Sequence, residues 1–291
     1  METAKTLVTR DGARLAYRIS RAAAPRGTVV LIHGLASNLT RWSEFVATTR
    51  LAADWDLLRP DLRGHGGSEW RGRVGMDVWC DDLAAVLAAE GVRRAVLVGH
   101  CLGANVALWF AHRRPELVAG LVLVEPMFHD ALKETLARVA RWRPALRPVV
   151  LALRALAALG LYRRRLVALD LEQLDRQARA AMARAQGGFP EERYASPWED
   201  LKSFPASVYL QDLLAVTGPL PELGGIRTPA LALLSAGAAL SDPEVTAGRL
   251  AALPGCRIER LAARHWIPTE QPEAMQRAID GWCRALENPP A

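Results

Sequence analysis

Short apolar runs alternate with amphipathic stretches along most of the chain. Runs of this length, rich in Val, Ile and Leu, are typical of strands buried in a parallel sheet. We expect such strands at 13–19, 27–32, 95–98, 121–124, 229–234 and 257–261. Apolar residues spaced three and four apart indicate helices between them. We expect these helices at 42–51, 76–89, 102–112 and 273–286.

Strands that alternate with helices predict an α/β fold, with a mostly parallel sheet covered by helices on both faces. In such folds the loops at the carboxyl ends of the strands hold the functional site. The rhythm breaks over residues 127–224, which are helical in pattern, rich in Ala, Leu and Arg, and without a clear strand. We therefore expect a core formed by 1–126 and 225–291, with 127–224 inserted as a helical cap.

The most apolar part of the expected cap is the run 149–161. A membrane span needs about 20 such residues, and this run is shorter and contains Arg154. Three interpretations stay open: core packing against the sheet, the lining of an apolar acyl pocket, and binding to a membrane surface beside Arg163–Arg165.

Composition is ordinary for a folded enzyme and narrows the class of partner. The chain has 291 residues, of which 51% are hydrophobic and 23% charged, with a net charge of +6. The basic excess comes without a zinc finger, an RNA-binding signature or a Walker loop, so we expect no nucleic-acid partner. We expect no transmembrane segment either. The first residues lack the apolar core of a signal peptide, which favours a cytoplasmic protein.

The cysteines show neither paired spacing nor a metal-ligand pattern, so we expect reduced thiols and no metal. They are Cys80, Cys101, Cys256 and Cys283. Residues 132–165 carry nine basic side chains and one acid, Glu134. This excess fits either a solvated basic face or a basic rim for an anionic leaving group. A coenzyme A or carrier-protein thioester would supply such a group.

The candidate chemistry begins where the strand 95–98 meets the next helix. Gly99, Cys101 and Gly103 form the pattern Gly-x-Cys-x-Gly. This is the nucleophile-elbow pattern with sulfur in place of the serine oxygen. A tight strand-to-helix turn lifts the central side chain off the sheet, and the amides of the new helix favour a thiolate there.

Three further blocks surround this motif in a fixed order. The strand 27–32 runs into His33-Gly34-Leu35, a glycine-rich turn spans 61–68, and His265-Trp266-Ile-Pro follows the strand 257–261. In this order the blocks resemble the α/β-hydrolase superfamily, closest to capped esterases, lactonases and C–C hydrolases. The cysteine is similar to that of dienelactone hydrolases and polyester synthases. The resemblance covers nearly all of the chain outside the cap and implies an eight-stranded sheet.

The resemblance also assigns roles to residues. It implies Cys101 as nucleophile, His265 as general base, and the backbone N–H groups of Leu35 and Leu102 as the oxyanion hole. A catalytic triad also needs an acid. We further expect substrate contacts, or a share in shaping the substrate site, from residues of the same loops: His33, Gly34, Asn38 and Trp266.

The acid is the ambiguous member of the triad. Relatives usually carry an Asp after the strand 229–234, but Ala238 occupies that position here and Asp242 is displaced from it. Some relatives place the acid at the end of the preceding strand, where this chain has Glu125. A carboxylate at either place could orient the imidazole. We favour Glu125 and keep Asp242 as the alternative.

These residues predict a cofactor-free hydrolase that acts on a small-molecule carboxylic ester, thioester or lactone through an acyl-Cys101 intermediate. An acyltransferase or cyclase would use the same intermediate, and a non-catalytic binding protein could retain the same scaffold. Because Gly-His-Ser-Leu-Gly is common among relatives, the sequence also leaves open whether Cys101 stands in place of a natural serine.

Overall fold

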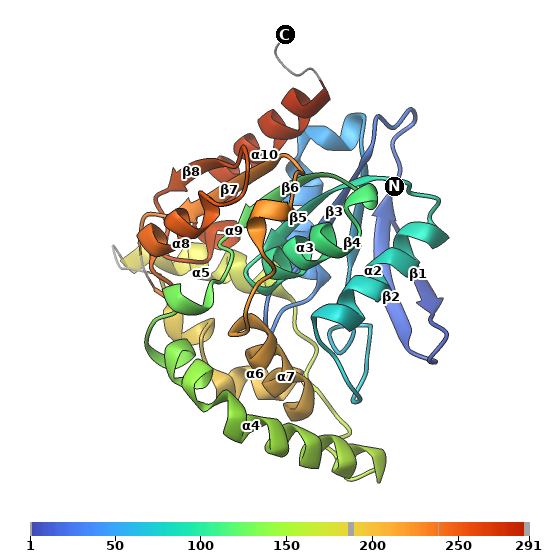
Figure 1. Ribbon diagram of the computed structural model, residues 1–291, viewed down its shortest axis with the longest axis vertical. Coiled ribbons are helices and arrows are strands. Elements are labelled where there is room, and N and C mark those ends of the chain that lie inside the picture. Colours follow the sequence, from blue (N-terminus) through green and yellow to red (C-terminus); the bar gives the residue numbers. More distant parts are fainter. Residues whose placement is uncertain (1, 186–188, 238, 288–291) are drawn as a thin grey trace.

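Eight strands form one sheet through the middle of the molecule (Figure 1). The computed structural model describes residues 2–185, 189–237 and 239–287. Across the sheet the order is β1-β2-β4-β3-β5-β6-β7-β8, with β2 antiparallel to both its neighbours and all other pairs parallel. The strands are β1 (Glu2–Val8), β2 (Arg14–Ser20), β3 (Thr28–Ile32), β4 (Asp56–Pro60), β5 (Ala95–His100), β6 (Val118–Val124), β7 (Ala230–Ser235) and β8 (Arg257–Leu261).

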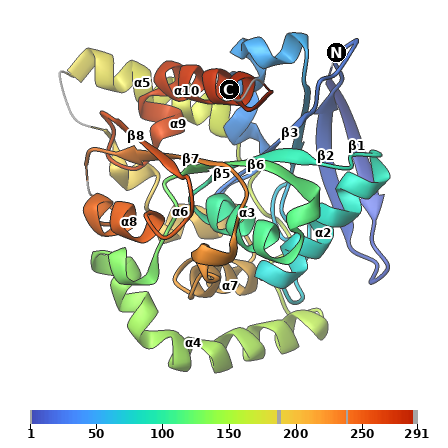
Figure 2. The same ribbon diagram turned by 45° about the horizontal axis from the view of Figure 1, so that its top comes forward.

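Helices cover both faces of this sheet, as Figure 2 shows. One face carries α1 (Ser43–Thr48), α9 (Ile267–Glu270) and α10 (Pro272–Glu287), and the other carries α2 (Met76–Ala89), α3 (Leu102–Arg113) and α8 (Pro243–Leu250). The mostly parallel eight-stranded α/β fold predicted from the sequence is confirmed.

The central strands read as continuous apolar runs because both of their faces are buried. In β3, Val29 and Leu31 belong to the core under α1 and α10, whereas Val30 and Ile32 belong to the core under α2 and α3. Successive side chains of a strand point to opposite faces, so a strand covered on both sides must be apolar throughout.

Two expectations about the first quarter of the chain were incomplete or wrong. Strand β1 was missed, because this edge strand is largely exposed and polar and therefore lacks a hydrophobic pattern. The single helix expected at 42–51 is wrong: α1 ends at Thr48, and Thr49 is extended with φ −64° and ψ 138°. The Thr49 side chain then accepts a hydrogen bond from the Leu51 N–H and starts a separate 3-10 turn.

Between β6 and β7 the chain forms helices, and no strand is present in its described part (residues 127–185 and 189–224). These helices are α4 (Glu134–Ala158), α5 (Leu171–Ala185), α6 (Pro197–Ser203) and α7 (Ala206–Val216). We call residues 127–224 the inserted segment. Helix α4 packs on α7, and Arg143 donates to the Thr217 hydroxyl (3.2 Å). Figure 1 places α4, α6 and α7 together below the sheet.

The apolar run 149–161 does not pack against the sheet, so the first of its three interpretations, core packing, is wrong. Within it Val150 is buried, but Leu151, Leu159 and Leu161 are each more than 60% exposed. None of its residues lines the cavity described below, which excludes the second interpretation, an acyl-pocket lining. The run forms the outer face of α4 and the turn after it.

Candidate active site

Cys101 lies at the sharp turn between β5 and α3. Its backbone has φ 54° and ψ −116°, a left-handed conformation that an L-residue adopts only when the surroundings enforce it. The two flanking glycines show why the turn can be so tight. A Cβ on Gly99 would lie 2.3 Å from the Gly103 backbone, and one on Gly103 would lie 2.3 Å from the Ile32 carbonyl oxygen. Helix α3 therefore sits directly against the strands, with Cys101 at its N-terminus.

His265 follows β8 and is buried next to Cys101. Its Nδ1 donates to Glu125 Oε2 at 3.0 Å, which leaves Nε2 for the hydrogen bond with the Cys101 side chain. Burial alone would lower the pKa of His265. Hydrogen bonds to Cys101 and Glu125, together with the negative charges of these groups, raise the pKa of His265 to about 10. The positively charged imidazolium is therefore favoured beside the sulfur.

The loop that carries His265 is organised by Glu270, a residue that the sequence analysis did not single out. The Glu270 carboxylate accepts hydrogen bonds from the backbone N–H groups of Arg264, His265 and Trp266 at 3.0–3.2 Å. A Glu a few residues after the histidine, at the end of a short helix, was the available signal. Glu270 fixes the direction in which the imidazole enters the site.

Glu125 lies directly after β6 and is buried, with a left-handed φ of 53°. One carboxylate oxygen accepts the Ser235 N–H at the end of β7, and the other faces His265. Asp242 lies elsewhere. It caps α8 by accepting from the Glu244 and Val245 N–H groups and is 3.5 Å from Lys133 Nζ. The structure thus brings Glu125, and not Asp242, to the imidazole; Ala238 lies outside the described residues.

The expected oxyanion positions flank the sulfur. Leu102 is the first residue of α3, so its N–H precedes the intrahelical hydrogen bonds of that helix. Leu35 and Gly34 line the cavity over Cys101 from the loop after β3. A Cβ on Gly34 would lie 3.3 Å from Cys101 Cβ, which shows how closely this loop approaches Cys101.

Two residues expected at the substrate lie behind the site instead. His33 is fully buried: its Nδ1–H donates to the Gly34 carbonyl (2.9 Å), and its Nε2 accepts from the Leu62 N–H (3.0 Å). The Asn38 amide donates to the Leu169 carbonyl at 2.7 Å. Neither residue lines the cavity. Both side chains form hydrogen bonds with backbone groups instead. They hold the loop, and Asn38 ties it to the inserted segment.

A cavity of about 1300 Å³ lies between Cys101 and the inserted segment. Trp266 lines it as expected and stacks on Phe189, with ring centroids 4.8 Å apart and an interplanar angle of 19°. Tyr194 lies against both rings and also lines the cavity. Sequence reasoning missed this aromatic wall, because Phe189 and Tyr194 lie in a part of the chain that has no motif.

His100, the residue before Cys101, is neutral in this setting. It is buried, and its Nε2–H donates to the His265 carbonyl (3.3 Å). Burial, reinforced by the charge of His265, holds the pKa of His100 well below its usual value. Its ring supports the backbone of the histidine loop.

Two buried ion pairs join the inserted segment to the core. Arg41 Nη1 lies 2.6 Å from Asp175 of α5, and His65 Nε2 lies 2.9 Å from Asp212 of α7. Burial alone would lower the pKa of His65, but the charge of Asp212 and the hydrogen bond to it raise that pKa. Arg41 also lines the cavity.

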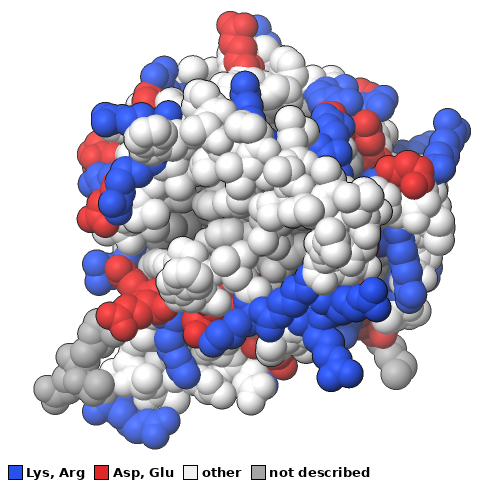
Figure 3. Space-filling model, turned by 90° about the horizontal axis from the view of Figure 1, so that it is seen from below, with Lys and Arg blue, Asp and Glu red and all other residues white. Residues whose placement is uncertain are grey.

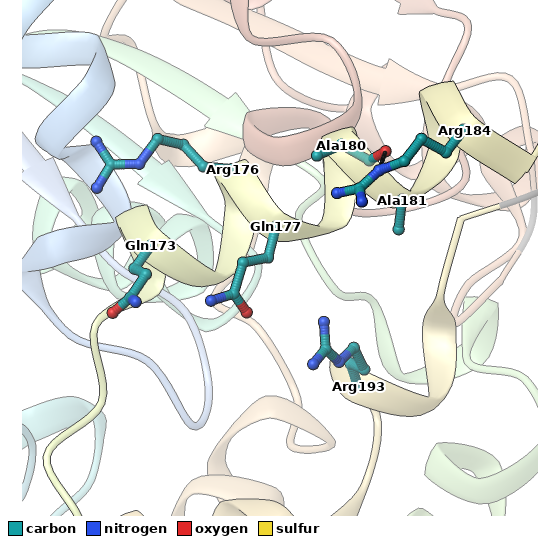
Figure 4. A pocket seen from close by; sticks show the side chains of 7 residues that line it. All are labelled: Gln173, Arg176, Gln177, Ala180, Ala181, Arg184 and Arg193. Carbon is teal, nitrogen blue, oxygen red and sulfur yellow. Dashed lines mark hydrogen bonds between the residues drawn. The ribbon is translucent and has the colours of Figure 1, made fainter.

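A second, more open hollow of about 810 Å³ lies beside α5 (Figure 4). Six of its seven lining residues come from α5, and Arg193 reaches toward them from a later segment. The lining holds amides, guanidinium groups and alanines but no nucleophile or acid. It has no side chain that could begin the chemistry expected at Cys101.

Within the described residues, no group of three or more His, Cys, Asp or Glu side chains is placed to hold a metal ion. In the same part of the chain, no helix has both the length and the apolar character to cross a bilayer.

Comparison with known proteins places the chain in a family. Residues 27–268 match the alpha/beta hydrolase fold family. Lipase LipV of Mycobacterium tuberculosis is 38% identical over 101 residues, covering 34% of this chain and 36% of the lipase. The 2-hydroxymuconate semialdehyde hydrolase of Pseudomonas is 35% identical over 99 residues, covering 33% and 35% of the two chains. This chain thus spans about a third of the length of such curated relatives.

Solved structures agree on the fold. The enol-lactonase from Burkholderia xenovorans superposes with a TM-score of 0.69 at 20% identity, covering 96% of this chain and 100% of the lactonase. The likeness extends through the inserted segment as well as the sheet.

Proposed function

The chain belongs to the alpha/beta hydrolase fold family of enzymes, and from that premise we propose that it hydrolyses carboxylic esters, thioesters or lactones through Cys101. One observation carries the proposal. The side chain of Cys101 sits at a strained turn, hydrogen-bonded to a buried His265 that is itself held by Glu125. A nucleophile, a base and an orienting acid in this chain of contacts are the parts that acyl transfer requires.

In the first half of the reaction the Cys101 thiolate attacks the substrate carbonyl carbon. The developing oxyanion accepts hydrogen bonds from the Leu102 and Leu35 N–H groups. When the tetrahedral intermediate collapses, the bond to the leaving group breaks and the His265 imidazolium gives that group its proton. The product of this half is a thioester on Cys101 and a free alcohol or thiol; with a lactone the new hydroxyl stays on the acyl chain bound to Cys101.

In the second half a water molecule replaces the leaving group. His265, now neutral, takes a proton from the water as it attacks the thioester carbonyl, and the C–S bond breaks to restore the thiolate. The carboxylic acid leaves, and the imidazolium–thiolate pair is restored. Glu125 stays ionised throughout and stabilises the imidazolium.

The cavity supports a substrate with a sizeable apolar acyl part. Its lining is mainly aliphatic and aromatic, and its volume exceeds the usual range for small-molecule sites of about 300–1,000 Å³. The charged residues that line it are of both signs. The basic ones are Arg41, Lys133, Arg193 and Lys202, and the acidic ones are Glu134, Glu191, Glu192, Glu199 and Asp200. Of the basic residues in 132–165, Lys133 alone is among the lining residues that the structure describes.

Thioesters of coenzyme A or a carrier protein remain within this proposal as acyl donors. If the basic side chains near the cavity bind such a donor, its KM must rise with salt, whereas the KM of a neutral ester must not. Measuring both KM values over a salt series separates the two donor classes.

Intact-mass spectrometry tests the nucleophile directly. The parent protein and Cys101→Ala are exposed to p-nitrophenyl esters of graded acyl length and quenched in acid. We expect a mass gain equal to one acyl group in the parent only, and turnover reduced by about 10⁶-fold in the variant. Cys101→Ser serves as the conservative control, since it retains a nucleophile of similar shape. Acylation that persists in Cys101→Ala, or no acylation with any ester, would contradict the proposal.

Acyl transfer to an acceptor other than water is the second candidate, because amines attack a thioester more readily than they attack an oxyester. Adding a primary amine or an alcohol to the assay and measuring the ratio of amide or ester to free acid decides between the two. If the ratio of amide or ester to free acid stays near zero as the acceptor concentration rises, the result supports hydrolysis. A scaffold that only binds would show neither acylation nor turnover.

A further inference from the structure

The outer face of α4 and the turn after it carry most of the exposed apolar side chains of the molecule. Eleven large hydrophobic side chains are exposed among the described residues, and eight of them fall between 142 and 167. Leu159 is the most exposed of these eight, at 75%. We call these eight the α4 surface: Trp142, Val149, Leu151, Leu156, Leu159, Leu161, Tyr162 and Val167. Clustering of this kind marks an interaction site, whereas single exposed hydrophobics do not.

Basic side chains predominate in the stretch that carries this surface. The stretch 132–165 holds nine basic side chains against a single acid, and three of the nine follow one another at Arg163–Arg165. Figure 3 looks onto this side of the molecule and shows a broad area without charged side chains, bordered on one side by a band of Lys and Arg that has Asp and Glu at its left end. The α4 surface therefore combines an apolar centre with a basic margin.

Contacts with the rest of the inserted segment hold the turn after α4 in place. Arg163 donates to the Leu201 carbonyl (3.1 Å), and the Val167 N–H donates to the Lys202 carbonyl (2.9 Å). The Arg71 guanidinium lies 4.3 Å from the centroid of the Tyr162 ring. Fixed side chains lose little conformational entropy on binding, which favours a built docking face over a disordered tail.

We propose that the α4 surface docks onto a lipid bilayer that contains anionic lipids, with α4 lying in the plane of the interface. Exposed apolar side chains of the α4 surface enter the boundary between headgroups and acyl chains, and flanking arginines pair with lipid phosphates. The absence of a spanning helix among the described residues agrees with surface docking. A second copy of this chain is a poorer occupant, because two identical basic margins would face each other across the contact.

Docking would place the cavity beside the membrane. Val167 belongs both to the α4 surface and to the lining of the cavity over Cys101. The bilayer would therefore meet the protein on the side where the inserted segment borders that cavity. The docking itself does not depend on the reaction at Cys101, so it is measured without substrate.

Cosedimentation with vesicles tests this inference on the full chain. Vesicles of phosphatidylcholine alone are compared with vesicles of phosphatidylcholine mixed with phosphatidylglycerol. We expect sedimentation with the mixed vesicles, weakening as salt rises, and little with the neutral ones. Each arginine near an anionic surface is worth about a fivefold change in partition, so Arg164→Gln with Arg165→Gln should weaken binding by about 25-fold.

An apolar pair of variants tests the other half of the surface. Leu159→Ser with Leu161→Ser removes two of its most exposed side chains and should weaken partition by at least about tenfold. Matched controls lie at the other end of the chain, where Val8 is 67% exposed at the end of β1 and Arg10 is exposed after it. Val8→Ser with Arg10→Gln should bind vesicles as the parent does.

Three results would overturn the inference. The first is no sedimentation with mixed vesicles at low salt, and the second is equal binding by the parent and both α4 variants. The third is concentration-dependent dimerisation in light scattering that Leu159→Ser with Leu161→Ser abolishes, together with no lipid binding. That last result would assign the α4 surface to self-association.

Discussion

The ends of the neighbouring strands β6 and β7 offer the site two carboxylates in opposite surroundings. Glu125 ends β6 in a left-handed conformation, is buried, and lies 3.0 Å from His265. Asp242 comes later, after β7, where it is partly exposed and its Oδ1 caps the N-terminus of α8. The difference shows that proximity in sequence to the usual acid position is a weaker guide than the partners a carboxylate already has.

The end of β7 still contributes to the site, through hydrogen bonds. The Ser235 N–H binds the carboxylate of Glu125, and the Ser235 hydroxyl lies 3.0 Å from the carbonyls of Gly237 and Arg264. The end of β6 therefore supplies the charge of Glu125, and the end of β7 supplies the hydrogen bonds of Ser235, which we call the frame of the site. The predictions below separate these two contributions.

Among changes at these two strand ends, the largest expected effect comes from removing the charge of Glu125. In Glu125→Gln, an amide N–H would face the Nδ1–H of His265, so two donors would oppose each other or the ring would take the wrong tautomer. We expect kcat/KM to fall by about 10³- to 10⁴-fold. Steady-state kinetics on an activated ester measures this, with Asp242→Asn as the matched control. If Asp242→Asn lost activity and Glu125→Gln did not, the comparison of the two strand ends would be reversed.

The pH profile sharpens the same point. His265 has a pKa of about 10 in the fold, above the ordinary histidine pKa of 6.5, so the imidazolium persists until the pH approaches 10. Activity that needs this acid should decline as pH rises through about 10. In Glu125→Gln the alkaline limb should move to lower pH, because one of the two negative partners is gone. An unchanged alkaline limit in the residual activity of the variant would argue against their coupling.

The raised pKa of His265 also makes the free energy of unfolding depend on pH. Because the folded pKa lies above the unfolded one, the contribution of His265 is fully present below about pH 6.5 and is lost as pH rises toward 10. Urea unfolding of the parent and Glu125→Gln across this window should show a smaller alkaline loss in the variant.

Ser235→Ala tests the frame and should have a moderate effect. It keeps the N–H that binds Glu125 but removes the hydroxyl that bridges toward Gly237 and Arg264. A hydrogen bond contributes about 0.5–1.5 kcal/mol net, and these carbonyls are only partly buried, so we expect a loss of about 1 kcal/mol in the free energy of unfolding. Urea denaturation gives this value. Ser235→Thr, which retains a hydroxyl, is the control for loss of the group itself.

Asp242→Ala should have the smallest effect. It removes the side-chain cap of α8 and should lower the Tm by about 2 °C while leaving kcat/KM unchanged. Differential scanning calorimetry measures the shift. Asp242→Asn should retain the parental Tm, because Asn caps helices as well as Asp does. A loss of activity in Asp242→Ala at unchanged Tm would show that Asp242 serves the reaction.

Local patterns were enough to predict the sheet and the turn that carries Cys101. Strands such as β3 and β5 are apolar on both faces, so their composition alone indicates burial. The pair Gly99 and Gly103 marks the turn, because any larger side chain would meet backbone there. These features depend on residues that are close in sequence.

Features that depend on contacts between residues far apart in the chain could not be predicted from the sequence. Strand β1 is stabilised by pairing with β2 and not by burial, and the wall made by Phe189, Tyr194 and Trp266 joins residues far apart in the chain. The run 149–161 has the composition of a core segment, yet only packing could show that its leucines face outward. Glu125 could be proposed from a strand end, but its contact with His265 needed the fold.

The two buried ion pairs that cross from core to inserted segment set a condition for protein engineering. Chimaeras that transplant residues 127–224 from a relative would leave Arg41 and His65 facing whatever the donor brings. A graft without a counterpart of Asp175 would leave the buried Arg41 guanidinium without its ion-pair partner. A graft without a counterpart of Asp212 would leave the His65 imidazole without its acceptor. Breaking such a buried pair costs about 3–5 kcal/mol, a large share of the stability of a typical protein. Exchange of substrate preference by recombination is therefore restricted to donors that carry both acids in register.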